Sequence, residues 1–353
     1  MIAAIRTELR KERICRFAAC WVILLFCLGA TGAPPAPGYH HVKKITLGGE
    51  GGWDYLTIDS AARRLYIARA TRVMVLDADS GAQVGEIADT PGVHGVALAP
   101  QLGRGFTSNG RASTVTIFDL KTLKPLGQAK TGSNPDAIVY DAVTRRVFTF
   151  NGASKDATVI GAADGSVSGT IALDGKPEFA VADEAGRIYV NLEDKSELLA
   201  IDSRQLTILN RWPLAPCKEP SGLAMDRKNR RLFVGCGNKL MAVVDADSGR
   251  VLTTLPIGSG VDAIAFDPGT ALAFSSNGDG TLTVVREESP DKFTVVENVA
   301  TQRGARTMAL DEKTHNVYLV TAEFGPPREP TPDNPRGRPG MLPGSFVLLV
   351  FGQ

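Results

Sequence analysis

Seven polar residues recur along this 353-residue chain at intervals of 40 to 44 residues. They are Asp54, His94, Asp136, Glu178, Ser221, Asp262 and Arg306. Carboxylates and an imidazole hold divalent cations or transfer protons, and a guanidinium binds anions. If the repeat gathers these positions around one axis, they form a ring. Its candidate ligand-binding members are Asp54, His94, Asp136, Glu178, Asp262 and Arg306, with Trp53, Lys176, Glu219 and Arg303 in neighbouring loop positions.

The chemistry of such a ring has three interpretations. Several carboxylates around one narrow opening repel each other, so they need a cation, the Arg306 guanidinium or a proton. Oxygen-rich ligation suits Ca²⁺ or Mg²⁺, whereas His94 with carboxylates suits Zn²⁺ or Mn²⁺. The second interpretation is a small-molecule or protein ligand, and the third is that short polar residues only start strands and cap turns. We commit to no cofactor, because no H-x-x-x-H spacing is present.

The elements that would position the ring follow from the same period. In each unit an apolar stretch ends in a turn residue, usually Asp, and an aromatic residue follows about seven positions later. The stretches end at residues 59, 99, 141, 183, 226, 267 and 311. In the fifth unit, strands are expected at 221–225, 231–236, 240–245 and 250–257. Seven four-stranded units of this period predict an all-β fold, a seven-bladed β-propeller of residues 41–353.

The two ends of this region predict how the ring closes. Residues 41–48 (HVKKITLG) have the pattern of a fourth strand with no first three before it. The last unit has three strand patterns and no fourth. We therefore expect the N-terminal strand to complete the last blade, which removes open sheet edges.

The repeats resemble the YVTN-repeat β-propeller family, the YncE-like proteins. The second-strand and third-strand segments that carry the resemblance include RLYIAR, FTFNG, IYVNL, VMVLDADSG and MAVVDADSG. The sixth unit departs from the pattern, with VVREE in place of the V-I-D ending. The family is mostly exported, and many of its members have no assigned activity. The resemblance therefore implies a fold and a compartment, and it implies little about chemistry.

No catalytic motif selects a reaction. The chain contains no G-x-S-x-G, P-loop, H-E-x-x-H or C-x-x-C-H sequence. We expect a ligand-binding or interaction module without turnover of its own. The alternative is a lyase or lactone hydrolase that uses a divalent cation at the mouth, with the ring carboxylates and His94 as ligands or bases. Arg306 would then hold an anionic substrate.

The first 32 residues predict a signal peptide. Residues 1–16 carry five basic side chains, and residues 17–30 form an apolar run too short for a comfortable membrane span. A linker is expected at 33–40. No Arg-Arg pair precedes the run, so we expect export by the general secretory route to the periplasm or the outside. An uncleaved anchor is the alternative.

Only two cysteines, Cys217 and Cys236, follow the predicted signal peptide. Antiparallel pairing in the fifth unit places them at the same end of a hairpin. In an exported protein such a pair predicts a disulfide. Free thiols or a soft-metal site with a third ligand are the alternatives.

Two surface features complete the predictions. Residues 324–345 hold seven prolines, so we expect an insertion that is a lid, a docking arm over the mouth, or a disordered loop. Its arginines are Arg328, Arg336 and Arg338.

Basic residues also recur in the first-to-second-strand turns, on the opposite face. The formal net charge is only +1, and no aromatic run interleaves with these residues. Solvated turns are therefore the main interpretation, and nucleic-acid binding on this basic face is the weaker alternative.

Overall fold

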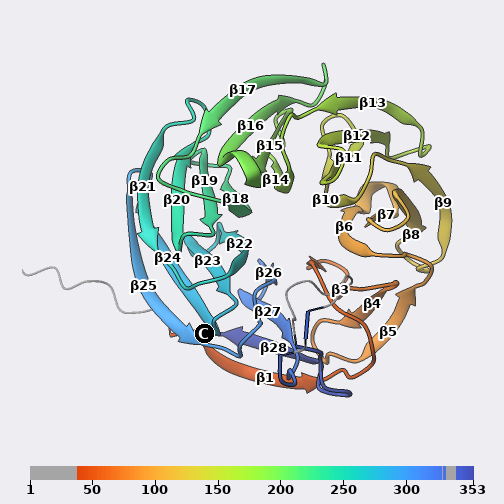
Figure 1. Cartoon of the computed structure of the whole chain (residues 1–353), viewed down its shortest axis with the longest axis vertical. Coiled ribbons are helices and arrows are strands. Elements are labelled where there is room, and N and C mark those ends of the chain that lie inside the picture. Colours follow the sequence, from red (N-terminus) through yellow and green to blue (C-terminus); the bar gives the residue numbers. More distant parts are fainter. Residues whose placement is uncertain (1–37, 328, 331–338) are drawn as a thin grey trace, which may run out of the picture. The chain divides into compact units, whose positions relative to one another are not determined.

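Each predicted repeat forms one antiparallel four-stranded sheet, and seven such sheets stand as blades around a common axis (Figure 1). The computed structural model describes residues 38–327, 329–330 and 339–353. The predicted signal peptide, most of the linker and the three arginines of the insertion lie outside these residues. The prediction of an all-β, seven-bladed propeller is confirmed.

The strands of blades 1 to 6 follow one another in the sequence. Blades 1 and 2 comprise β2 (Leu56–Asp59), β3 (Arg64–Arg69), β4 (Arg72–Asp77), β5 (Gln83–Ile87), β6 (Val93–Ala99), β7 (Arg104–Asn109), β8 (Thr114–Asp119) and β9 (Pro125–Lys130). Blades 3 and 4 comprise β10 (Pro135–Asp141), β11 (Arg146–Asn151), β12 (Asp156–Gly161), β13 (Val167–Ala172), β14 (Pro177–Ala182), β15 (Arg187–Leu192), β16 (Glu197–Asp202) and β17 (Thr207–Pro213). Blades 5 and 6 comprise β18 (Pro220–Asp226), β19 (Arg231–Cys236), β20 (Leu240–Asp245), β21 (Val251–Pro256), β22 (Val261–Asp267), β23 (Leu272–Asn277), β24 (Thr281–Ser289) and β25 (Lys292–Ala300).

Blade 7 joins the two ends of the propeller. It contains β26 (Met308–Asp311), β27 (Asn316–Thr321) and β28 (Val347–Gly352), and β1 (His40–Thr46) pairs antiparallel with β28 as its fourth strand. The Tyr39 hydroxyl adds a 2.8 Å hydrogen bond to the His315 carbonyl. The predicted closure by the N-terminal strand is therefore present. The only helical elements among the described residues are the short 3-10 turns η1 (Pro100–Leu102) and η2 (Glu193–Lys195), and no described helix has the length and apolarity to cross a membrane.

The core lies between neighbouring blades. In each unit the repeated aromatic sits on the second strand and is at most 1 % exposed: Tyr66, Phe106, Phe148, Tyr189, Phe233, Phe274 and Tyr318. Two of the tyrosines also reach across to the next blade, where the hydroxyl of Tyr189 donates to the carbonyl of Ala246 and that of Tyr318 to Ala78. The seven-residue offset between turn and aromatic therefore marks the side chain that packs adjacent blades together.

The first strand of every blade lies innermost. First strands of neighbouring blades contact each other all the way round, including β26 with β2. The second and third strands are almost wholly buried, and the fourth strands form the exposed outer edge (Figure 1). Residues at the start of the first strands are thus the ones that reach the axis.

The insertion between β27 and β28 is anchored at its base. Phe324 pairs with Met341 as an isolated antiparallel bridge, and Gly325 and Leu342 donate backbone hydrogen bonds to Gly340 and Glu323. This is a single bridge, and no strand is present in the described part of the insertion, as the prolines lead one to expect.

The predicted disulfide joins Cys217 to Cys236, whose Cα atoms are 5.4 Å apart. Cys217 lies in the connection between blades 4 and 5, and Cys236 ends β19. The bond ties this connection to the blade that follows it, and both side chains are buried.

We expect the double variant Cys217→Ser/Cys236→Ser to lose about 3 kcal/mol of unfolding free energy, because the crosslink restricts the unfolded chain. Denaturant unfolding under oxidising conditions measures this. Reduction of the unaltered protein serves as the control and should give a similar loss. Equal stability of oxidised, reduced and mutant protein would contradict the prediction.

Candidate functional site at the channel mouth

The ring residues stand where the first strands depart from regular pairing. In blades 2 to 6 the register with the second strand shifts at the ring residue, as between Val93 and Val96 around His94 and between Val261 and Ile264 around Asp262. In blades 1 and 7 the strand begins only two residues later. A bulge releases the side chain from the alternation of the sheet. This irregularity therefore allows a polar residue at the start of a core strand to face the mouth.

Hydrogen bonds between blades hold the ring backbone. The amide of Tyr55 donates to the His94 carbonyl, and the hydroxyl of Ser221 donates to the Asp262 carbonyl. The carbonyls of Asp136, Ser221 and Arg306 accept from the preceding blade in the same way. Ser221 thus has a structural role, and the other six ring residues carry the charges.

Two aromatic rings close the channel beneath the ring. Tyr55 of blade 1 and Phe179 of blade 4 meet edge to face, with centroids 4.4 Å apart. Both directly follow a ring residue. In the other blades that position is Gly95, Ala137, Gly222, Ala263 and Thr307. The small residues leave space for two large ones, so the mouth is a charged rim over an aromatic floor.

The sequence interpretation missed this floor. The alternation of two large and five small residues directly after the ring positions was the pattern that could have revealed it. The pKa of the Tyr55 hydroxyl shows how the mouth charges act on this floor. Burial raises that pKa well above its usual value, and four carboxylates reinforce the effect: Asp136, Glu178, Asp54 and Asp262. All four carboxylates therefore act on one point of the axis.

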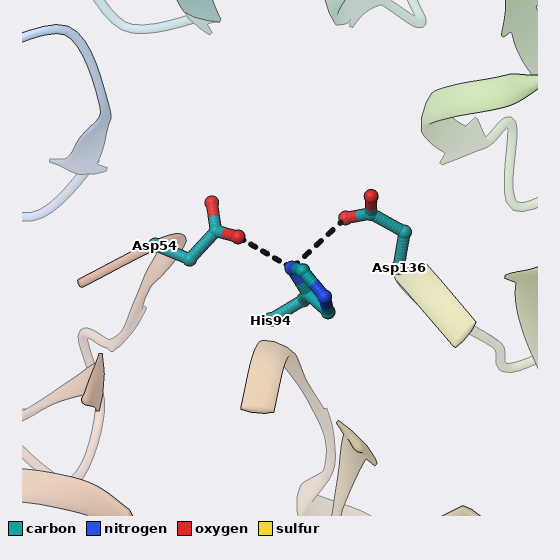
Figure 2. A group of neighbouring side chains, drawn as sticks. All are labelled: Asp54, His94 and Asp136. Atoms are coloured by element: carbon teal, nitrogen blue, oxygen red, sulfur yellow. Dashed lines mark hydrogen bonds and ion pairs between the residues drawn. The ribbon is translucent and has the colours of Figure 1, made fainter. Parts of the chain in front are cut away.

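His94 lies between two aspartates of the flanking blades (Figure 2). Its Nδ1 is 2.6 Å from Asp54 Oδ2 and 3.6 Å from Asp136 Oδ1. Burial alone would lower the pKa of His94, but these carboxylates and a hydrogen bond with the side chain of Asn134 raise it to about 9. Around neutral pH His94 is therefore an imidazolium that lies between Asp54 and Asp136.

The same three residues offer a metal site. One ligand atom of each lies within 4.8 Å of the others. A divalent cation would have to replace the proton on His94, since a protonated imidazole nitrogen has no lone pair to donate. The donor set of one nitrogen and two carboxylates suits Zn²⁺ or Mn²⁺ better than Ca²⁺.

A second group lies in blade 4. Lys176 Nζ is 2.6 Å from Glu178 and also pairs with Glu193 of η2. Burial, together with the Asp136 charge, nevertheless raises the pKa of Glu178 to about 8. One ammonium does not offset two carboxylates in this setting. Glu193 was not among the sequence candidates, because it belongs to the turn between the second and third strands.

The third group is the pair of Asp262 and Arg306, separated by 3.4 Å. Burial raises the pKa of Asp262 from 3.8 to about 7, and the pull of Arg306 does not cancel this effect. Asp262 Oδ2 is buried and accepts no hydrogen bond from any described residue. Half of the Arg306 side chain is exposed. Asp262 is therefore the least compensated carboxylate of the mouth.

The opposite face shows why its basic turns are poor candidates for nucleic-acid binding. Arg230 pairs with Asp183 and Asp247, Arg231 with Asp245, and Arg63 with Asp79 and Asp311. These guanidinium groups are occupied by carboxylates of the chain itself, which leaves them less free to bind phosphates.

Known proteins resemble this chain in fold only. No family model and no curated protein matches the sequence. Among solved structures, the crystal structure of RRP9 WD40 repeats aligns with a TM-score of 0.72 at 10 % identity, over 90 % of this chain and 99 % of that chain. The structure of U3-55K aligns with a TM-score of 0.71, at the same identity and coverage. The protein is thus a seven-bladed β-propeller with WD40-repeat structural neighbours, and at this identity the likeness carries no activity with it.

The raised pKa values predict that the free energy of unfolding falls between about pH 5 and pH 9. Glu178 and Asp262 keep protons in the folded state that they release in the unfolded chain. Their ionisation therefore destabilises the folded state increasingly as the pH rises, up to about pH 8 for Glu178 and about pH 7 for Asp262. The stabilisation from protonated His94 is complete below about 6.5 and is lost as the pH passes 9. Denaturant unfolding across this range measures the slope, and a rising stability would refute the assignment.

Replacing the least compensated carboxylate should stabilise the protein. We expect Asp262→Asn to raise the unfolding free energy by about 1–3 kcal/mol at pH 8, with a smaller gain at pH 5, where the native carboxyl is protonated. Asp89→Asn, which changes an exposed carboxylate, is the matched control and should shift stability little. A loss of stability in Asp262→Asn at pH 8 would mean that its pair with Arg306 dominates.

Proposed function

We propose that this chain is an exported binding propeller of the YVTN-repeat type that takes a cationic ligand at the channel mouth. The observation that carries the proposal is the set of converging carboxylates, in which one buried oxygen of Asp262 has no hydrogen-bond partner among the described residues. Such an arrangement destabilises the free protein. A bound positive group would remove this destabilisation, and the gain would appear as binding affinity.

The charges of the mouth favour a cation over an anion. Once Glu178 and Asp262 are ionised, five carboxylates face three basic groups: Asp54, Asp136, Glu178, Glu193 and Asp262 against His94, Lys176 and Arg306. Each basic group is already paired. The aromatic floor of Tyr55 and Phe179 adds a ring face over which an organic ammonium packs well. A compact organic cation therefore fits the mouth better than a hydrated metal ion does.

A metal-assisted enzyme is the second candidate. The observation that favours it is the closeness of Asp54, His94 and Asp136. In that case these residues would hold the cation, and Arg306 would orient an anionic substrate, as a lyase or lactone hydrolase requires. The imidazolium state of His94 counts against it near neutral pH, because the metal must first displace that proton.

Export is supported by two features of the chain. The apolar run at residues 17–30 has the length of a signal-peptide core, and the disulfide between Cys217 and Cys236 suits an oxidising compartment. Secretion of the protein through the general secretory route, with processing near residue 32, is the corresponding proposal.

Calorimetric titration with 1,4-diaminobutane, Ca²⁺, Mg²⁺, Mn²⁺ and Zn²⁺ at pH 8 tests the proposed ligand class. We expect the diammonium to bind, and Asp262→Asn and Glu178→Gln each to weaken it about fivefold or more through the loss of one charge-assisted contact. Asp89→Asn should leave it unchanged. Failure of the diammonium to bind, or equal affinity in all variants, would overturn the cationic-ligand proposal.

The same titration separates the two candidates. If the metal enzyme is correct, Zn²⁺ or Mn²⁺ should bind stoichiometrically, His94→Gln should abolish that binding, and elemental content of the purified protein should agree. If the organic cation is correct, His94→Gln should retain diammonium binding and the protein should remain indifferent to chelator.

A further inference from the structure

We infer a second binding site next to the ring, for a small organic anion with a flat aromatic body. It is a cleft of about 1030 Å³ between the loop before β2, the loop before β26 and the base of the insertion. Its lining includes Trp53, Arg303, Arg306, Glu323, Phe324 and Leu342. The volume lies at the upper end of the range for small-molecule sites. This inference goes beyond the proposed cation site and does not rest on it.

The apolar side of the cleft is built around Trp53. The Trp53 ring packs against Phe346 and Phe324, with centroids 5.2 Å and 6.0 Å apart. Phe346 is completely buried, whereas Phe324 and Leu342 are each 41 % exposed. Two large apolar side chains of the insertion are thus left uncovered over a tilted aromatic wall, which is the surface that a flat ring would cover.

The polar side of the cleft carries an excess of positive charge. The guanidinium of Arg303 has no ion pair or hydrogen bond with the side chains of the described residues, and Arg306 has only its 3.4 Å contact with Asp262. Among the described lining residues, Glu323 is the single carboxylate. The guanidinium of Arg303, unpaired among the described side chains, with Arg306 held only by its 3.4 Å contact with Asp262, therefore favours a negatively charged ligand head.

A third guanidinium lies behind the aromatic wall. Arg69 is fully buried, its Cζ lies 3.7 Å from the centre of the Phe346 ring, and its Nε and Nη1 have no hydrogen-bond partner among the described residues. Carbonyls of Gly48 and Glu50 accept from its remaining nitrogen. Arg69 pairs with no carboxylate of the described residues, so it adds positive potential to the region behind Phe346.

The cleft is held open by backbone contacts between its walls. The hydroxyl of Thr321 donates to the Arg303 carbonyl at 2.8 Å, and the amide of Leu342 donates to the Glu323 carbonyl at 2.8 Å. Gly304 has a φ of 82°, and a Cβ there would approach Thr321 and Phe324 to about 3.0 and 3.1 Å. Glycine at this position lets Arg303 and Phe324 share one cavity, so the site is preformed.

The test uses three naphthalene probes of nearly equal size and different charge, measured by calorimetry on the unaltered protein. The probes are 2-naphthoate, the neutral 2-naphthylmethanol and the cationic 2-naphthylmethylammonium. We expect 2-naphthoate to bind about tenfold more tightly than the alcohol, and the ammonium to bind more weakly than the alcohol at this site.

Variants then assign the contacts. Arg303→Gln should weaken 2-naphthoate about tenfold and leave the alcohol unchanged, whereas Phe324→Ala should weaken both probes. Glu323→Gln should strengthen 2-naphthoate. Arg111→Gln, an exposed arginine on the same face outside the cleft, is the matched control and should have no effect. Unchanged melting temperatures of these surface variants confirm that they fold.

Equal affinity for the anion and the alcohol, an equal response to Arg303→Gln and Arg111→Gln, or no binding of 2-naphthoate would each overturn the inference. Failure of the cation proposal is distinguishable, because 1,4-diaminobutane binding reports on Glu178 and Asp262 and is not expected to respond to Phe324→Ala.

Discussion

The narrow axis of the ring is the constraint on which the rest of the structure depends. Seven first strands converge there, and each places one ring residue at the mouth, followed by a residue that is large only in blades 1 and 4. The interior accommodates Tyr55 and Phe179 because the equivalent positions in the other blades are small. With the channel filled by rings, the polar residues above it rest on apolar groups instead of water. Burial is accordingly the largest cause of the raised pKa values of Glu178 and Asp262.

The basic partners of these carboxylates differ from blade to blade, so one side of the mouth is less neutralised than the other. An imidazolium serves two aspartates at His94, and an ammonium serves two glutamates at Lys176. At Asp262 a half-exposed guanidinium lies 3.4 Å away, and one carboxylate oxygen has no partner in the described part of the chain. A positive ligand group gains most where the existing partner is weakest. We therefore expect the ligand to sit off the axis, toward blades 6 and 7.

The sequence repeat predicts the architecture, because each blade must repeat its turn residue, its packing aromatic and its residue at the mouth. That is why the number of blades, the closure by β1 and the ring positions were predictable, whereas the disulfide followed from the hairpin that brings its two cysteines together. Pairing within the ring was not, since it depends on how far each side chain reaches across the axis. The partner of Glu178 comes from the loop before its strand, and Glu193 comes from a turn 15 residues later. The cleft was equally hidden, because Trp53, Arg303 and Phe324 belong to three separate segments and share no repeat position.

Arg306 connects the two sites that we propose. It is the partner of Asp262 on the ring side and part of the cleft lining on the other. A cation that binds Asp262 takes over the role of this guanidinium, which is then free to turn toward an anion in the cleft. Linkage requires the reverse effect as well, so that an anion drawing Arg306 into the cleft leaves Asp262 more exposed to a cation. A ligand that carries both charges, or two ligands that bind together, would therefore bind more tightly than a ligand with either charge alone.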